Sequence, residues 1–125
     1  MLKHAIHWFE IPTQDLARAT RFYETVLDVK LKPEDMGPMK LALFPREGDE
    51  AVAGALLFDG RRKPSGEGAL VYLNADGKLD ACLARVAKAG GQIALPKTDI
   101  GDPGFIAIVV DTEGNSVGLH AERPH

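Results

Sequence analysis

Apolar and polar residues alternate in two short stretches of the chain, residues 5–11 and 69–75. Alternation with a period of two is typical of a β-strand that buries one face. After each stretch, apolar residues recur at helical spacing, over residues 16–27 and 79–89, as in an amphipathic helix that packs on a sheet. The pattern therefore predicts a strand followed by a helix, twice along the chain.

Shorter strand candidates follow both helices, separated by clusters of Gly, Pro and charged residues that favour turns. The loop at residues 96–104, PKTDIGDPG, has no periodicity and is a candidate for covering the mouth of a cavity. Thr13 or Asp15 can cap the first helix. The predicted strands lie at residues 29–32, 40–46 and 51–58 after the first helix, and at residues 92–95, 105–110 and 116–122 after the second.

The two halves of the chain share this plan. Leu16 and Leu79, which begin the helices, are 63 residues apart, and Gly54 and Gly118 in the last strands are 64 residues apart. A module of this size cannot bury both faces of its sheet, so the modules should pair around a concavity, within the chain or across a dimer. We predict one α+β domain over residues 1–125, with a first module at about 4–59, a linker at 60–68 and a second module at about 69–123.

Composition and charge exclude several classes of function. With 125 residues, of which 45% are hydrophobic, the chain is long enough for one well-buried domain. A formal net charge of −3 offers no basic field for nucleic acid. No apolar run approaches the roughly 18 residues of a membrane span, so we expect a cytoplasmic protein with no membrane partner. The single cysteine, Cys82, falls on the apolar side of the second helix and is predicted to be a buried, inert thiol.

Longer motifs lie at both ends of this plan: WFEIPTQDLARATRFYETVLD in the first module, and AGGQIALPKTDI and DTEGNSVGLH in the second. They resemble motifs of the glyoxalase, bleomycin-resistance and extradiol-dioxygenase superfamily, in the branch related to lactoylglutathione lyase. The resemblance covers nearly the whole chain. It implies the vicinal oxygen chelate fold: two βαβββ modules form a curved eight-stranded mixed sheet, the helices cover its outer face, and the inner face forms the site. By alternation, the inner face would carry Trp8, Glu10, Leu70, Tyr72, Asn74, Gly118, His120 and Glu122.

Metal-dependent members of this superfamily draw four His, Glu or Gln ligands from the first and last strands of both modules. The resemblance carries these positions over to Trp8, Gly54, Leu70 and Gly118, none of which can bind a metal. We therefore expect the usual chelate to be absent. The alternative is a metal-dependent lyase or dioxygenase with nickel, zinc, manganese or iron on displaced ligands, for which Glu10, His7 and His120 are the candidates.

Glu10 and His120 are also the candidates for chemistry without a metal. Both share the predicted inner face, where a carboxylate and an imidazole can serve as general acid and base. The alternative is that Glu10 accepts hydrogen bonds from a neighbouring loop and that His120 is solvated. His7 shares its face with Phe9 and Ile11, so we expect a hydrogen-bonded histidine beneath the helix.

Aromatic residues would line the cavity. Asn74 would supply a polar anchor, which suits a small, partly apolar organic ligand, although ordinary core packing is the alternative. The predicted aromatic walls are Trp8, Phe44, Phe58 and Tyr72.

The sequence thus predicts a glyoxalase-like protein that binds such a ligand, with acid/base chemistry of the lyase or isomerase type as an extension. We also expect a homodimer. A third interpretation is a dimerisation or sequestration module with no catalysis.

Overall fold

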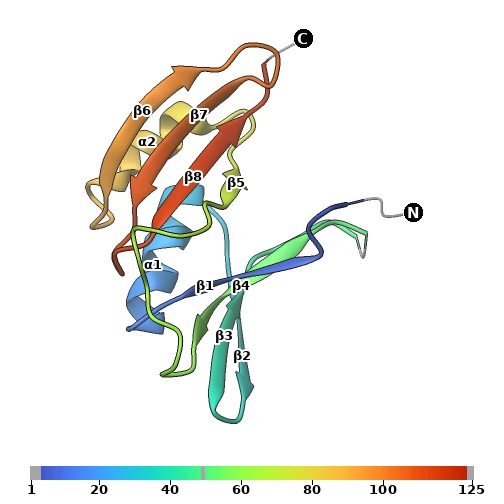
Figure 1. Cartoon of the computed structure of the whole chain (residues 1–125), viewed down its shortest axis with the longest axis vertical. Coiled ribbons are helices and arrows are strands. Elements are labelled where there is room, and N and C mark those ends of the chain that lie inside the picture. Colours follow the sequence, from blue (N-terminus) through green and yellow to red (C-terminus); the bar gives the residue numbers. More distant parts are fainter. Residues whose placement is uncertain (1–3, 49, 124–125) are drawn as a thin grey trace.

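The structure, a computed structural model, describes residues 4–48 and 50–123 and confirms the α+β class and the repeated βαβββ plan. Two modules follow one another along the chain (Figure 1). The first contains β1 (Trp8–Pro12), α1 (Leu16–Leu27), β2 (Lys32–Met36), β3 (Met39–Leu43) and β4 (Ala53–Phe58), and the second contains β5 (Tyr72–Asn74), α2 (Leu79–Val86), β6 (Gln92–Asp99), β7 (Phe105–Val110) and β8 (Ser116–Ala121).

Each module forms its own mixed four-stranded sheet. Sheet A has the strand order β1-β4-β3-β2, and sheet B has the order β5-β8-β7-β6. In each sheet the first and last strands of the module pair in parallel, and the remaining neighbours are antiparallel. The eight strands are thus divided between two sheets instead of being hydrogen bonded into one.

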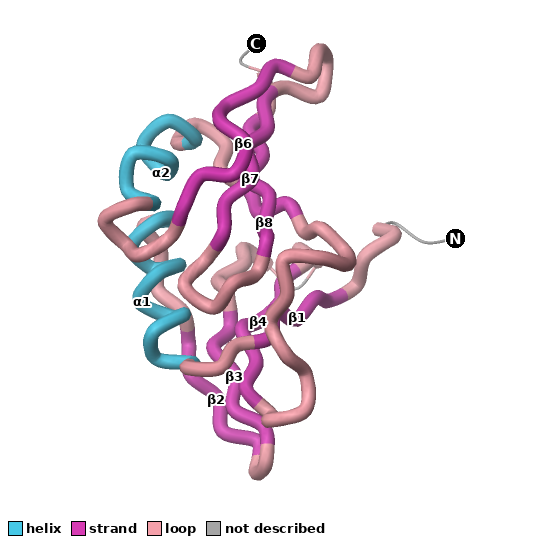
Figure 2. The backbone as a smooth tube through the Cα atoms, turned by 60° about the vertical axis from the view of Figure 1, so that its left-hand side comes forward, coloured by secondary structure: helices cyan, strands magenta, loops and turns pink. Residues whose placement is uncertain are grey.

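Both helices lie on the same side of the molecule and contact each other, with sheet B above and sheet A below in the view shown (Figures 1 and 2). The main core fills the space between the helices and the two sheets. It combines residues of both modules, including Phe22 of α1, Leu56 of β4, Val86 of α2 and Leu119 of β8. We call the sheet surface that packs on the helices the helix face, and the opposite surface the inner face.

Local sequence explains where α1 begins and ends. The Asp15 side chain accepts a hydrogen bond from the Arg18 backbone N–H at 3.0 Å, so Asp15 is the N-cap. The Thr13 hydroxyl, the other candidate cap, instead donates to the Leu57 carbonyl at 3.1 Å. Asp28 ends the helix in the left-handed conformation, with φ of 55°.

Several strand boundaries differ from the prediction. β2 begins at Lys32, where the predicted strand 29–32 ends. β6 continues to residue 99 through two register shifts on either side of Leu95, so only residues 100–104 of the predicted loop 96–104 connect β6 to β7. Such bulges allow an edge strand to accommodate Pro96. Only residues 72–74 of the predicted strand 69–75 are in β5.

The N-terminal segment corrects the expectation for His7. β1 begins at Trp8, and the residues described before it, including His7, are exposed. His7 therefore does not lie beneath the helix, because the sheet starts one residue after it. Cys82 is buried, and burial raises the pKa of its thiol. No helix in the described ranges is long and apolar enough to span a membrane.

Candidate functional site

The inner face of sheet B carries the largest group of predicted site residues. Tyr72 pairs with Gly118 across the β5–β8 ladder, and Asn74 pairs with His120. Paired residues point to the same side of a sheet. Leu73, between Tyr72 and Asn74, is buried in the core with the helices. The two pairs therefore face away from the helices, as the sequence predicted.

The Tyr72 ring lies directly over Gly118. A Cβ atom at position 118 would be 2.3–2.8 Å from three atoms of this ring, which is closer than any van der Waals contact allows. The absence of a side chain at Gly118 therefore lets the ring approach the backbone of β8 closely. Tyr72 remains 43% exposed and presents an aromatic surface to solvent.

Half-buried isoleucines continue this surface on β7. Ile108 pairs with Gly118, and Ile106 pairs with His120. On β6, Leu95 pairs with Ile108 and extends the apolar row. The inner face of sheet B is thus a mainly apolar surface, with Asn74 and His120 as its polar residues next to Tyr72.

Hydrogen bonds hold both polar side chains in place. His120 Nε2 lies 2.6 Å from the carbonyl oxygen of Pro103 in the β6–β7 turn. The Asn74 side-chain oxygen accepts a hydrogen bond from the Asp76 backbone N–H at 2.8 Å. The remnant of the predicted cavity loop, residues 100–104, therefore reaches the inner face at His120.

Trp8 and Glu10 lie on the inner face of sheet A. The Trp8 indole Nε1 donates to the Glu10 carboxylate at 3.3 Å, which places the two side chains on one face. Trp8 is 42% exposed. Beside them lies a small apolar cluster of Leu41, Ala55 and Leu57.

Phe44 and Phe58 correct the predicted aromatic walls, because both lie on the helix face. The Phe44 ring is 5.7 Å from that of the buried Tyr23 of α1, measured between centroids. Phe58 is two residues after Leu56, which packs against the helices, so it projects to the same side. Residues 53–57 are all buried, so β4 has no alternation from which the face of Phe58 could be predicted, and these aromatics do not line the inner face.

Gly54 is also on the helix face. It pairs with Phe9, and a Cβ atom at this position would lie 2.5 Å from the Phe9 ring. The position of β4 that matches Gly118 is Ala55, which pairs with Glu10 just as Gly118 pairs with Tyr72. The match of Gly54 with Gly118 was wrong by one residue, because Ala55 and Gly118 are 63 residues apart, the same separation as the helix starts Leu16 and Leu79.

Glu10 and His120 are not brought together within the chain. Glu10 belongs to sheet A and bonds Trp8, whereas His120 belongs to sheet B and bonds Pro103. No hydrogen bond or ion pair joins them among the described residues.

The donor set does not fit the metal that the family implies. Trp8, Ala55 and Gly118 face inward at three of the four ligand positions, and Leu70, at the fourth, is a 39% exposed apolar residue just before β5. None has a side chain that coordinates a cation. Within residues 4–48 and 50–123, no group of three or more His, Cys, Asp or Glu side chains is arranged to hold a metal ion.

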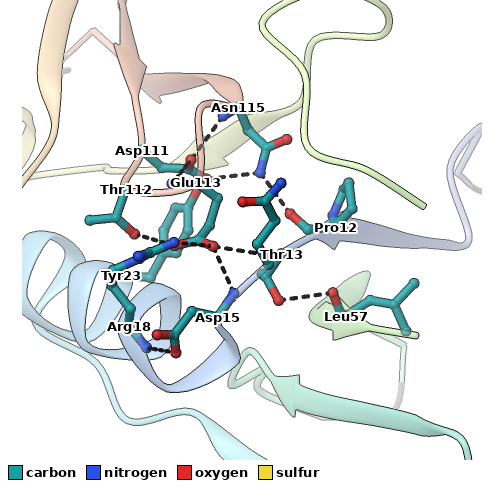
Figure 3. Close-up of polar contacts among 11 residues, drawn as sticks. Pro12, Thr13, Asp15, Arg18, Tyr23, Leu57, Asp111, Thr112, Glu113 and Asn115 are labelled. Atoms are coloured by element: carbon teal, nitrogen blue, oxygen red, sulfur yellow. Dashed lines mark hydrogen bonds and ion pairs between the residues drawn. The ribbon is translucent and has the colours of Figure 1, made fainter. Parts of the chain in front are cut away.

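A polar cluster outside the predicted site joins the two modules (Figure 3). Glu113, in the β7–β8 turn, accepts hydrogen bonds from the backbone N–H groups of Gln14 and Asp15, both at 2.9 Å. Its carboxylate also pairs with Arg18 at 2.7 and 3.0 Å. Glu113 thus occupies the positive N-terminal end of α1, where a carboxylate is stabilised.

Burial alone would raise the pKa of Glu113, whose side chain has no exposed surface. Hydrogen bonds from Arg18, the Asp15 backbone, Thr112 and the Gln14 backbone outweigh this effect and hold the pKa at about 2. Glu113 is therefore charged at neutral pH.

Asp111 and Asn115 complete this cluster. The Tyr23 hydroxyl of α1 donates to Asp111 at 2.6 Å, and burial together with the Asp111 charge raises the pKa of Tyr23 well above its usual value. Asn115 donates from its side chain to Asp111 at 3.1 Å and to the Pro12 carbonyl at 2.8 Å. Its side-chain oxygen accepts from the Ser65 backbone in the linker.

The other end of α1 is held by α2. Lys78 donates to the Leu27 carbonyl at 2.6 Å, and Arg85 donates to the Val26 carbonyl at 2.8 and 3.2 Å. Cations at the carbonyl end of a helix complement its dipole. Side chains of the second module therefore bind both ends of α1. These contacts hold the helices between the sheets, and both inner faces point away from the helices.

A cavity of about 150 Å³ lies between the modules. Its lining is mainly apolar and includes Phe9, Leu27, Phe44 and Leu73, with Asn74 and Lys78 as polar residues. Phe44, which was predicted to line the ligand site, lines this cavity instead.

Sequence reasoning missed the role of the turn DTEGN, which it treated only as a hairpin connection. The signal was present, because Asp111, Glu113 and Asn115 alternate within five residues. Such side chains can bind backbone N–H groups of their own turn and of a facing helix. Asp111 accepts from the backbone N–H groups of Glu113 and Asn115 in its own turn, and Glu113 accepts from those of Gln14 and Asp15 at the start of α1.

Known proteins share this fold. Two curated relatives, named "Putative glyoxylase CFP32" in Mycobacterium bovis and in Mycobacterium tuberculosis, are each 29% identical over 125 residues, covering 95% of this chain and 46% of the relative. The chain thus spans about half the length of these curated relatives.

Solved structures agree at the level of the fold. A mutant glyoxalase I from Zea mays matches with a TM-score of 0.69 and 22% identity, over 92% of this chain and 45% of that one. A glyoxalase/bleomycin resistance protein from Albidiferax ferrireducens matches with a TM-score of 0.69 and 19% identity, over 97% and 100%. TnmS3, an antibiotic binding protein from a Streptomyces species, matches with a TM-score of 0.68 and 23% identity, over 98% and 99%. Residues 5–119 match the family described as Glyoxalase/Bleomycin resistance protein/Dioxygenase superfamily, and the chain belongs to it.

Proposed function

We propose that this protein binds a small, partly apolar organic molecule on the inner face of sheet B, without the family's metal chelate. The observation that carries this proposal is the Tyr72 ring, which occupies the space that a side chain at Gly118 would fill and is 43% exposed. Exposed aromatic surface beside half-buried Ile106 and Ile108 favours a ligand with a flat apolar part. Asn74 and His120, in the adjacent row, supply the polar contacts that orient it.

The name of one structural relative is consistent with this class of function. TnmS3 is described as an antibiotic binding protein, so a chain of this fold and length can serve for binding. Because fold alone does not determine function, the proposal rests on the inner face of sheet B.

Acid/base chemistry is the extension that His120 supports. Its Nε2 is held by Pro103, and its other ring nitrogen has no partner among the described residues. An oriented imidazole with one free nitrogen can accept a proton from a bound molecule. Glu10 is the second candidate, but it lies on the inner face of sheet A, whereas His120 lies on that of sheet B.

A homodimer would supply that second face. Side chains of the second module bind both ends of α1, so the inner faces of the two sheets in one chain are held apart and do not face each other. Sheet A of one copy facing sheet B of the other would cover Trp8 and Tyr72, which are 42% and 43% exposed. It would also bring Glu10 of one copy toward His120 of the other, which gives the second copy a role in the site.

The experiment is a thermal-shift screen of aldehydes, thiol conjugates and aromatic metabolites, followed by titration of the best compound against two variants. Tyr72→Ala removes the aromatic surface, whereas Phe58→Ala removes an aromatic of similar exposure, 38%, from the helix face. We expect at least a tenfold loss of affinity for Tyr72→Ala and less than a threefold change for Phe58→Ala. Equal affinities of the two variants would overturn the proposed location.

The metal-dependent alternative has its own measurement. Elemental analysis of protein purified without a chelator, with calorimetric titration of nickel, zinc and manganese, tests it directly. We expect no stoichiometric tight binding. Tight binding that His120→Ala abolishes would instead favour a lyase or dioxygenase with displaced ligands.

A further inference from the structure

Asn74 and His120 form a pair with a fixed hydrogen-bonding character. They are direct partners in the β5–β8 ladder, so their side chains project from strands about 4.8 Å apart. Each already makes one hydrogen bond to the chain's own backbone. Those two bonds determine what each side chain can still offer to a ligand.

His120 offers an acceptor. Its Nε2 lies 2.6 Å from the Pro103 carbonyl oxygen, which can only accept. Nε2 must therefore carry the proton, and in the neutral ring Nδ1 then has a free lone pair. No partner of Nδ1 is present among the described residues.

Asn74 offers a donor. Its amide oxygen accepts from the Asp76 backbone N–H at 2.8 Å, which fixes the amide orientation because the backbone N–H can only donate. The amide nitrogen, with two N–H groups, has no partner among the described residues. A ligand on this face thus meets an acceptor and a donor side by side.

The aromatic surface is formed at the neighbouring inward-facing pair of β5 and β8. Tyr72 and Gly118 precede Asn74 and His120 by two residues along their strands, a separation of about 6.6 Å. A fused two-ring compound is long enough to lie over Tyr72 and Gly118 and to place one edge against the next row. Ile106 and Ile108 continue the apolar surface on the far side of β8.

Resting on the proposed binding function, we infer that the ligand is a planar aromatic compound with an N–H or O–H donor and a carbonyl oxygen on the same edge, as in an aromatic lactam. The donor binds His120 Nδ1, and the carbonyl oxygen accepts from the Asn74 amide. The flat ring system lies over Tyr72. A compound whose edge has two acceptors would leave the lone pair of His120 facing another lone pair.

The test uses quinolin-2(1H)-one and its N-methyl derivative, which keeps the ring and carbonyl but lacks the donor. We expect the wild-type protein to bind the N–H compound at least tenfold more tightly, a difference of about 1.4 kcal/mol, because the N-methyl compound leaves the oriented His120 acceptor unpaired. His120→Phe should reduce this preference to less than threefold, and Tyr72→Ala should weaken binding of both compounds. Asn74→Ala is a second variant on an exposed position and should weaken both compounds equally.

The ring nitrogens of His120 give a readout that needs no ligand and no variant. Long-range proton–nitrogen NMR correlations of the neutral imidazole should show the proton on Nε2. A proton on Nδ1 would overturn the inference.

Failure of the inference can be distinguished from failure of the proposed function. Equal binding of both compounds, lost in Tyr72→Ala, would overturn the inference and leave the binding face in place. Binding of neither compound, while other aromatic compounds bind in a Tyr72-dependent way, would overturn the lactam class alone. Binding that no substitution on this face changes would overturn both.

Discussion

The Tyr23 hydroxyl on α1 donates a 2.6 Å hydrogen bond to Asp111 in the β7–β8 turn. This buried contact joins residues that are 88 positions apart and belong to different modules. Together with Glu113 at the start of α1, it fixes how the modules sit on each other. The directions of both inner faces, and hence the position of the candidate site, depend on this contact.

Tyr23→Phe should destabilise the fold by about 1–3 kcal/mol, because Asp111 loses a buried donor and keeps its charge. The matched control is Tyr72→Phe, whose ring is 43% exposed and whose hydroxyl has no partner among the described residues. It should change stability by less than about 0.5 kcal/mol. Urea denaturation of both variants gives the comparison, and a Tyr23→Phe protein as stable as the wild type would contradict the structural role of the contact.

Glu113 should make stability depend on pH in acid. Its pKa falls from 4.5 to about 2 on folding, so the unfolded chain binds more protons between these values and stability decreases as the pH falls from about 4.5 to 2. At neutral pH the contribution should be about 1–3 kcal/mol, less than the full shift implies, because Arg18 is 44% exposed and solvent screens the pair.

Glu113→Gln isolates this effect from other carboxylates. Asp35, Asp59 and Asp99 also have lowered pKa values, through hydrogen bonds of their own, and they titrate in both proteins. The difference in unfolding free energy between wild type and variant should be present at pH 7 and should shrink as the pH approaches 2. A difference that is constant across this range would show that the Glu113 charge does not hold the modules together.

The sequence predicted the repeated module and most of the inner face, because period-two alternation and helical spacing depend on burial alone. Tyr72, Asn74, Gly118 and His120 were placed together on this basis, and the structure pairs them. The prediction of which side chains share a face was wrong on β4. Five consecutive residues there, from Ala53 to Leu57, are buried, so there is no alternation to count. There the face of Phe58 could be assigned only from the partner strands.

The contacts between modules could not be predicted in the same way. Glu113 meets the start of α1 across 98 positions of sequence, and nothing in the local pattern of DTEGN identifies that partner. The tautomer of His120 likewise depends on a carbonyl 17 residues away, at a turn that the sequence predicted only as a loop. Such contacts can be identified only once the three-dimensional fold is known.

Gly118→Ala should weaken ligand binding more than it weakens the fold. The new methyl group would displace the Tyr72 ring, which can rotate toward solvent, so stability should fall by no more than about 1 kcal/mol. Affinity for an aromatic ligand should fall several-fold. Gly66→Ala is the control, because its Cβ would meet only ordinary contacts at 3.6 and 3.7 Å. Equal affinities of both variants would exclude a role for the close approach of the Tyr72 ring to Gly118.

Two copies of the chain should pair with unlike faces together. In a Cys82→Ala background, a mixture of Glu10→Cys and His120→Cys proteins should be joined by a short bismaleimide more efficiently than either protein alone. Analytical ultracentrifugation of the wild type should show a dimer. A monomer at micromolar concentration, or cross-linking equal to that of Arg61→Cys, an exposed linker position, would contradict the proposed arrangement.

The central claim is that a planar aromatic ligand binds on the inner face of sheet B, and NMR chemical-shift mapping with quinolin-2(1H)-one tests it most directly. We expect the largest changes at the amides of Tyr72, Ile106, Ile108, Gly118 and His120. Changes confined to Leu27, Val29 and Phe44, around the cavity between the modules, would contradict it.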